Sequence, residues 1–157
     1  MTFYLGQNLF GISILMVREI NQNIDITPVS MVPPYIKGVL NLRGQVVTVM
    51  DLAKRMSYQD LERSEDANCI VLKTLSEIEN NDTAMELEDR TTSDKVGLYV
   101  DRIGDVLDVN TKDIIKTPSQ HNDKFDKRFV RGVVRLKDQL LILLNLKELL
   151  NPDQKAE

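Results

Sequence analysis

The apolar positions of this chain fall in short runs rich in Val, Ile and Leu, separated by Gly, Asp, Asn or Pro. Runs of this kind are typical of β-strands joined by tight turns. They predict strands over residues 45–50, 68–75, 96–100 and 139–144. A short helix is expected directly after two of these strands, over residues 51–55 and 146–150, and Pro152 would end the second one.

Two dipeptides between apolar runs predict hairpin turns, namely Arg43-Gly44 and Lys137-Asp138. Gly44 has no Cβ, so it can adopt a positive φ at such a turn without a steric clash. The two turns occupy corresponding places in the chain, which points to a repeated unit.

The repeat is visible on self-comparison, because residues 35–52 align without gaps on residues 129–146 at an offset of 94 residues. Five of the 18 pairs are identical, including Gly38 with Gly132, and ten others keep their character. A weaker correspondence relates residues 10–20 to residues 96–106. The chain therefore consists of two related halves in tandem, with a period far longer than the roughly 20 to 50 residues of a solenoid unit.

Two of the predicted strands, over residues 46–50 and 140–144, are apolar on both faces instead of alternating. A small barrel fills its inside with one set of side chains, so the other set needs a cover, and the opposite half is the simplest one. We expect a single domain over residues 1–157 made of two packed barrels with a groove where they diverge. Its parts would be a first barrel, a second barrel and a C-terminal helix with tail, over residues 1–67, 68–144 and 145–157.

Charge is unevenly distributed along the chain. The formal net charge is −4, so attraction to a phosphate backbone cannot drive nucleic-acid binding. Residues 76–94 hold seven acids and one base, and we interpret them as an acidic insertion in the second barrel, a long mobile or partly disordered loop.

The single cysteine, Cys69, lies in an apolar run and excludes a disulfide within the chain, which fits a reducing compartment. The apolar stretch over residues 9–17 lacks the basic flank and cleavage site of a signal peptide. We expect a cytoplasmic protein.

Few residues could carry catalysis. His121 is the only histidine and lies in a polar stretch, and the glycines form no phosphate-binding motif. We expect no metal and no cofactor. Asp101, Asp105 and Asp108 are interpreted as solvated surface groups, and Asp51, whose repeat mate is Asn145, as a turn or capping residue.

Residues 34–52 resemble the hallmark of the CheW family, a Gly-Val-x-Asn-Leu-Arg-Gly stretch that runs into an apolar strand and Asp-Leu. The resemblance extends over nearly the whole chain. It implies an all-β fold of two five-stranded β-barrel subdomains packed face to face around a shared hydrophobic core, with a few short helices. It also implies a protein without enzymatic activity that binds the regulatory domain of the histidine kinase CheA and the cytoplasmic tip of methyl-accepting chemoreceptors.

The resemblance also implies the site residues. A groove between the barrels would bind the receptor through Val17, Glu19, Ile20, Arg43, Val100 and Val106, with Arg43 pairing with a receptor carboxylate. Kinase contacts are expected around Cys69, Ile70, Val71 and Leu72 or at the turn of Val134, Arg135, Leu136 and Lys137. Gly38, Gly44 and Gly132 are assigned to backbone geometry.

Two alternatives stay open at this stage. The chain could be a CheW-like module of a CheV- or CheA-type protein, although the start at Met1 and the tail after Pro152 favour a freestanding adaptor. A small β-barrel enzyme or ligand binder would need a polar pocket with convergent titratable groups.

Overall fold

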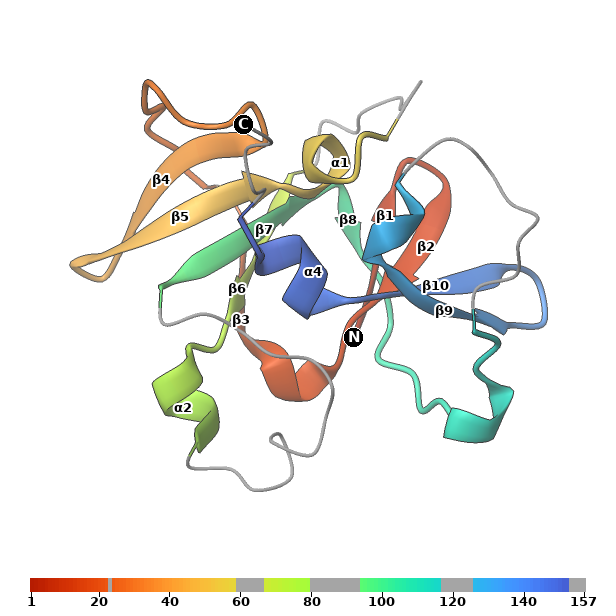
Figure 1. Cartoon of the computed structure of the whole chain (residues 1–157). Coiled ribbons are helices and arrows are strands. Elements are labelled where there is room, and N and C mark those ends of the chain that lie inside the picture. The colour runs from red at the N-terminus through yellow and green to blue at the C-terminus, as the bar shows by residue number, and fades with distance from the viewer. Residues whose placement is uncertain (23, 59–66, 80–93, 117–125, 153–157) are drawn as a thin grey trace.

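The computed structural model describes residues 1–22, 24–58, 67–79, 94–116 and 126–152. Ten strands form two five-stranded sheets that lie side by side (Figure 1). Sheet A has the order β8-β1-β2-β10-β9, with bounds Arg102–Ile103, Thr2–Leu5, Asn8–Gly11, Leu140–Leu144 and Val130–Arg135. Sheet B has the order β3-β6-β7-β5-β4, with bounds Val17–Gln22, Asn68–Leu72, Val96–Val100, Gln45–Asp51 and Ile36–Leu42. The expectation of an all-β fold is confirmed.

The two repeat units exchange strands. Each sheet combines the first two strands of one unit with the last three strands of the other. Sheet A therefore contains β1 and β2 with β8, β9 and β10, and sheet B contains β6 and β7 with β3, β4 and β5. The predicted barrels over residues 1–67 and 68–144 therefore do not coincide with the sheets. Sequence similarity between the two units carries no information on which strands pair.

Neither sheet closes through a continuous ladder of strand pairs among the described residues, which corrects the expectation of closed barrels. Instead, an isolated bridge links each sheet across its open side. Thr27, in the segment after the edge strand β3, pairs with Val39 of the other edge strand β4, and Ile115, in the segment after β8, pairs with Val133 of β9. Each bridge is made of two backbone hydrogen bonds, with N···O distances of 2.8 and 2.9 Å in both sheets. Each sheet is thus curled, with an inner face and an outer face.

Gly38 and Gly132 lie next to these bridges. A Cβ on Gly38 would come within 2.2 Å of the Thr27 carbonyl oxygen, and one on Gly132 within 2.7 Å of Ile114 Cγ2. Glycine leaves room for the crossing segment at both sites, and the constraint is stronger at Gly38, where the neighbouring atom belongs to the backbone.

The apolar side chains form three clusters. One lies between the two sheets and includes Phe3, Phe10, Leu98 and Leu144. The others fill the inner faces of the curled sheets, around Leu40, Val47 and Val49 in sheet B and around Leu9, Val134 and Leu141 in sheet A. In β10, Ile142 and Leu144 face the shared core while Leu141 and Leu143 face inward, which confirms the interpretation of a strand that is buried on both sides.

Short helices follow the last strand of each repeat unit, α1 (Leu52–Arg55) after β5 and α4 (Leu146–Leu150) after β10. The Asp51 side chain caps α1 by accepting from Lys54 N, and the Asn145 side chain caps α4 by accepting from Glu148 N. The predicted capping role of this pair is confirmed.

The buried Arg55 connects the two helices. Its guanidinium donates to the carbonyl oxygens of Glu148, Leu149 and Asn151 at the end of α4. A cation at this position satisfies carbonyl groups that have no partner within α4. It also interacts favourably with the negative end of the α4 dipole.

The acidic segment begins differently from the expectation. The strand β6 ends at Leu72 rather than at residue 75, and residues Leu75–Glu79 form the helix α2, with Ile78 buried in the shared core. The rest of the predicted insertion, residues 80–93, lies outside the described residues. The described residues also form three short 3-10 helices, η1 (Ile14–Met16), η2 (Thr111–Asp113) and η3 (Lys127–Phe129).

Candidate functional site

The turn between β4 and β5 positions the first candidate residue. Arg43 and Gly44 are its two central residues, and both have a positive φ, 52° and 81°. This is the backbone of a two-residue type I′ hairpin, so the predicted turn is confirmed. Gly44 N donates to Asn41 Oδ1 at 3.0 Å, which holds the turn and directs Arg43 away from the strand pair.

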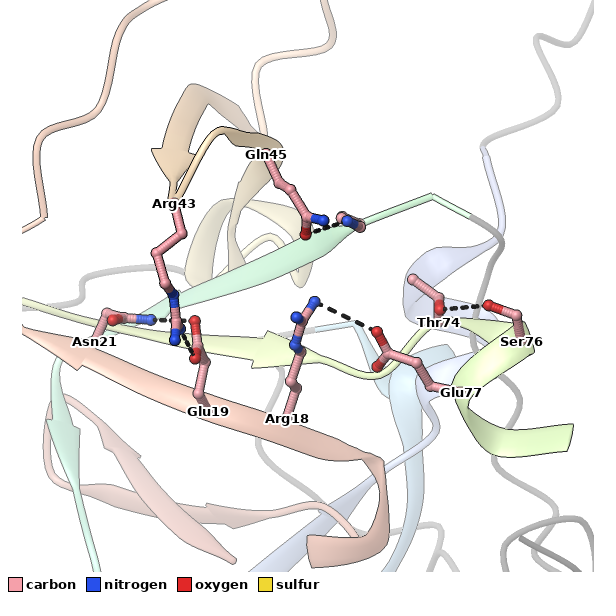
Figure 2. A network of polar contacts seen from close by, with 9 residues as sticks. Arg18, Glu19, Asn21, Arg43, Gln45, Thr74, Ser76 and Glu77 are labelled. Carbon is pink, nitrogen blue, oxygen red and sulfur yellow. Dashed lines mark hydrogen bonds and ion pairs between the residues drawn. The ribbon is translucent and has the colours of Figure 1, made fainter. Parts of the chain in front are cut away.

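Arg43 forms an ion pair with Glu19 of β3, on the opposite edge of sheet B. Figure 2 shows the Arg43 and Asn21 side chains converging on the Glu19 carboxylate, and Asn21 Nδ2 donates to Glu19 Oε1 at 3.3 Å. The hydrogen bond from Arg43 holds the pKa of Glu19 below its usual range, and the same contact raises the pKa of Arg43. Both groups therefore carry full charge at neutral pH.

The ion pair lies at the mouth of the curled sheet B, beside a cavity of about 160 Å3. The cavity floor is apolar and its rim is charged, with the lining residues Arg18, Glu19, Leu42, Arg43, Gln45, Val47 and Val71. Sequence reasoning named only Glu19, Arg43 and Val71 of this set, and it assigned Val71 to another partner. Leu42 and Gln45 flank Arg43 within the repeat motif, so that motif held a signal that could have found them.

A second ion pair extends this charged rim. Arg18 NH1 lies 3.3 Å from Glu77 Oε1 of α2, and Figure 2 shows the Arg18 side chain pointing toward Glu77. The start of the acidic segment thus lies beside the Arg43 site, an arrangement that the sequence alone did not indicate.

The other predicted receptor-binding residues do not join this cavity. Val17 and Ile20 are half-buried and pack against the shared core, on the other side of β3 from Glu19. Val100 is fully buried in the same core, so it does not line a surface groove. Val106 is 55 % exposed and follows β8 at the edge of sheet A. From the predicted receptor set, only Glu19 and Arg43 line this cavity, whereas Val17, Ile20 and Val100 meet at the shared core.

The predicted kinase-binding residues divide by burial. Cys69, Ile70, Val71, Leu72 and Val134 are at most 5 % exposed, because β6 is central in sheet B and Val134 faces the inside of sheet A. These side chains offer little accessible surface, although Val71 lines the cavity beside Arg43. Arg135 and Lys137 are exposed and Leu136 is half-buried, so the β9–β10 turn remains as the candidate surface.

Other groups with chemical potential have structural roles in this fold. Burial raises the pKa of the Cys69 thiol to about 12, with a smaller contribution from Glu19, so the thiol stays protonated at neutral pH. Asp101 is buried and accepts a hydrogen bond from Gly6 N at 2.8 Å, which corrects its interpretation as a solvated group. His121 lies outside the described residues.

Two further searches concern the described part of the chain only. It holds no group of three or more His, Cys, Asp or Glu side chains arranged to bind a metal ion. None of its helices combines the length and the apolar character required to cross a membrane.

Comparison with known proteins places the chain in a family. The model of the CheW-like domain matches residues 1–154. The chain is 31% identical to the chemotaxis protein CheW of Rhizobium meliloti over 144 residues, which cover 92% of this chain and 81% of that protein. It is 30% identical to CheW of Treponema pallidum over 148 residues, covering 94% and 79% of the two chains.

A solved structure agrees with the sequence comparisons. The scaffolding protein TtCheW from Thermoanaerobacter tengcongensis superposes with a TM-score of 0.76 at 27% identity, covering 99% of this chain and 94% of that one. Family model, relatives and fold lead to the same conclusion. The chain belongs to the CheW family and is a chemotaxis scaffold protein.

Proposed function

We propose that this chain is a cytoplasmic adaptor that couples a CheA-type histidine kinase to methyl-accepting chemoreceptors by binding both, without catalysing a reaction itself. Membership of the CheW family supports the adaptor role. Coupling would be positional, because holding kinase and receptor in one geometry changes the population of kinase states.

The single observation that carries the receptor assignment is the mouth of sheet B. There an exposed guanidinium, Arg43, stands over an apolar cavity and is held by Glu19. The receptor tip is a helical hairpin, and an amphipathic helix offers both an apolar stripe and carboxylates. Val17, Ile20 and Val106 lie outside this cavity, so they would belong to a separate part of the receptor contact, and the buried Val100 would only support the sheet from the core.

The kinase surface is proposed at the β9–β10 turn, through Arg135, Leu136 and Lys137. Lys137 is the repeat counterpart of Arg43, so the two partners would bind at corresponding turns of the two sheets. The turns lie in different sheets, which would allow both partners to bind at once.

Reciprocal charge reversals test this assignment. Each purified variant is presented to the regulatory domain of CheA and, separately, to a receptor signalling fragment. We expect Arg43→Glu to weaken receptor capture about tenfold, the effect of about 1.4 kcal/mol, and to spare kinase capture. Lys137→Glu should do the reverse. Equal loss of both partners in a folded variant would contradict separate surfaces.

A charge swap separates direct contact from positioning. The double variant with Glu19→Arg and Arg43→Glu keeps an ion pair across the mouth but reverses its orientation. If Arg43 itself pairs with a receptor carboxylate, the swap will not restore capture. Restoration would show that Arg43 acts only through Glu19 and would overturn the direct contact.

A further inference from the structure

Tyr58 covers part of the outer face of sheet A. Tyr58 follows α1 and packs edge to face on Phe10 of β2, with ring centroids 6.4 Å apart and an interplanar angle of 68°. Asn8 Nδ2 donates to the Tyr58 hydroxyl. The chain itself thus provides an aromatic ring, with a polar partner for its hydroxyl, on this face.

The repeat gives each of these residues a counterpart in the other half. At the offset of 94 residues, Tyr58 corresponds to Pro152, which follows α4 as Tyr58 follows α1. In the weaker correspondence, Phe10 aligns with Val96, so Asn8 aligns with Asp94. The strand register supports this alignment, since Phe10 pairs with Ile142 in sheet A and Val96 with Thr48, the repeat mate of Ile142, in sheet B.

The three counterparts lie together around a cavity. Asp94, Val96 and Pro152 all line a hollow of about 280 Å3 on the outer face of sheet B. It opens between β5 and the end of α4, which lie beside each other in Figure 1. The other lining residues are Tyr35, Ile36, Val46, Thr48, Met50, Lys95, Leu149, Leu150 and Asn151. Proline has no aromatic ring that could pack on Val96 as Tyr58 packs on Phe10.

The chemistry of the cavity fits one aromatic side chain. Cavities of about 150 Å3 lined by apolar side chains accept benzene, so this volume is sufficient for a phenol ring. Met50, Val96 and Leu149 supply apolar walls, and Asp94 stands where Asn8 meets the tyrosine hydroxyl in the other half. Val46, which lines the hollow, is 65 % exposed, so the hollow can be reached past an apolar side chain.

We propose that this hollow is a docking site for a tyrosine side chain of a partner protein, inserted where the chain's own Tyr58 sits in the other half. Residues 153–157, which follow Pro152, contain no aromatic residue that could take this place. The inference rests on the internal repeat and goes beyond the proposed kinase and receptor contacts, since none of their candidate residues lines this hollow.

N-acetyl-tyrosinamide serves as the probe, titrated into the 15N-labelled full chain and followed by NMR. We expect saturable shifts at the amides of Val46, Thr48 and Lys95, with half-saturation at roughly 1 to 10 mM, as is usual for a fragment of this size. N-acetyl-phenylalaninamide should bind about fivefold more weakly, the effect of one hydrogen bond, and Asp94→Ala should remove that preference. N-acetyl-leucinamide should give no saturable shift.

Two filling variants complete the test. Pro152→Tyr supplies the missing ring from the chain itself, and Thr48→Phe occupies the hollow from β5, so each should abolish the shifts while the rest of the spectrum is kept. Shifts that persist in both variants, equal binding of the leucine analogue, or no saturation with the tyrosine analogue would each overturn the proposal.

Discussion

The two curled sheets of this protein share one backbone plan, yet their openings are filled differently. In sheet A the Tyr4 ring lies on the inner face, and Arg102 Cζ lies 4.3 Å from the centroid of this ring. Gln139 Nε2 donates to the Tyr4 hydroxyl. In sheet B the repeat mate of Gln139, Gln45, bonds Lys95 instead, and the mouth keeps a cavity beside Arg43. The two repeat units share a backbone plan, and small side-chain differences leave a cavity at the mouth of sheet B.

On the outer faces, too, sheet A is covered and sheet B is open. Tyr58 covers its face in sheet A, whereas Pro152 at the matching place leaves a hollow in sheet B. The differences at the mouths and on the outer faces each depend on single side chains, since the two units share one backbone plan. Single substitutions can therefore test them.

The largest expected effect concerns the two bridging glycines. Gly38→Ala would force a Cβ against the Thr27 backbone oxygen at a φ of 155°, whereas the closest atom for Gly132→Ala is the side-chain carbon Ile114 Cγ2, which can move. We expect losses in unfolding free energy of about 3 and about 1 kcal/mol, measured by chemical denaturation. Equal losses would mean that the two crossings are equally tight.

An intermediate effect is expected from removing the ring that covers sheet A. Tyr58→Ala should lower the unfolding free energy by about 2 kcal/mol, because the ring is only partly buried, and should open a hollow like that in sheet B. Tyr58→Phe loses only the bond with Asn8 and should cost about 1 kcal/mol. Pro152→Ala should change stability little, and a loss as large as that of Tyr58→Ala would contradict the difference between the faces.

The smallest effect concerns the ion pair at the mouth of sheet B. Because the pKa of Glu19 is lowered from 4.5 in the folded state, its contribution to stability is present above about pH 4.5 and is lost as the pH falls through the folded value. The stability difference between the native chain and Glu19→Gln should therefore be constant near neutral pH and should vanish on acidification.

Denaturation midpoints from about pH 7 to about pH 3 measure this difference. Arg43→Ala is the matched control and should show the same loss of pH dependence. A difference that grows on acidification would contradict the ion pair, and the effect should remain small because the pair is exposed to solvent.

Much of the fold was predictable from local pattern. Local spacing and residue type predicted four of the strands, β5, β6, β7 and β10, within a few positions. They also predicted the hairpin turn at Arg43-Gly44 and the two short helices. The candidate site was predictable only in part. Glu19 and Arg43 were named, but Arg18, Leu42 and Gln45 come together with them only through the curl of sheet B.

Several other predicted site residues are buried. Val100 and the run Cys69 to Leu72 are apolar strand residues, and an apolar strand residue can face a groove or the core with the same local pattern. Only the position of β6 and β7 in the middle of sheet B decides between these cases.

The sequence by itself determined the repeat, the apolar strands and the residues that close each turn, because these depend on neighbours along the chain. Tertiary structure alone decided that the units exchange strands and that single bridges join the sheet edges. It also decided that two hollows lie in sheet B. These features depend on contacts between distant segments, and the alternation of a strand shows which residues share a face but not which strand will lie beside it.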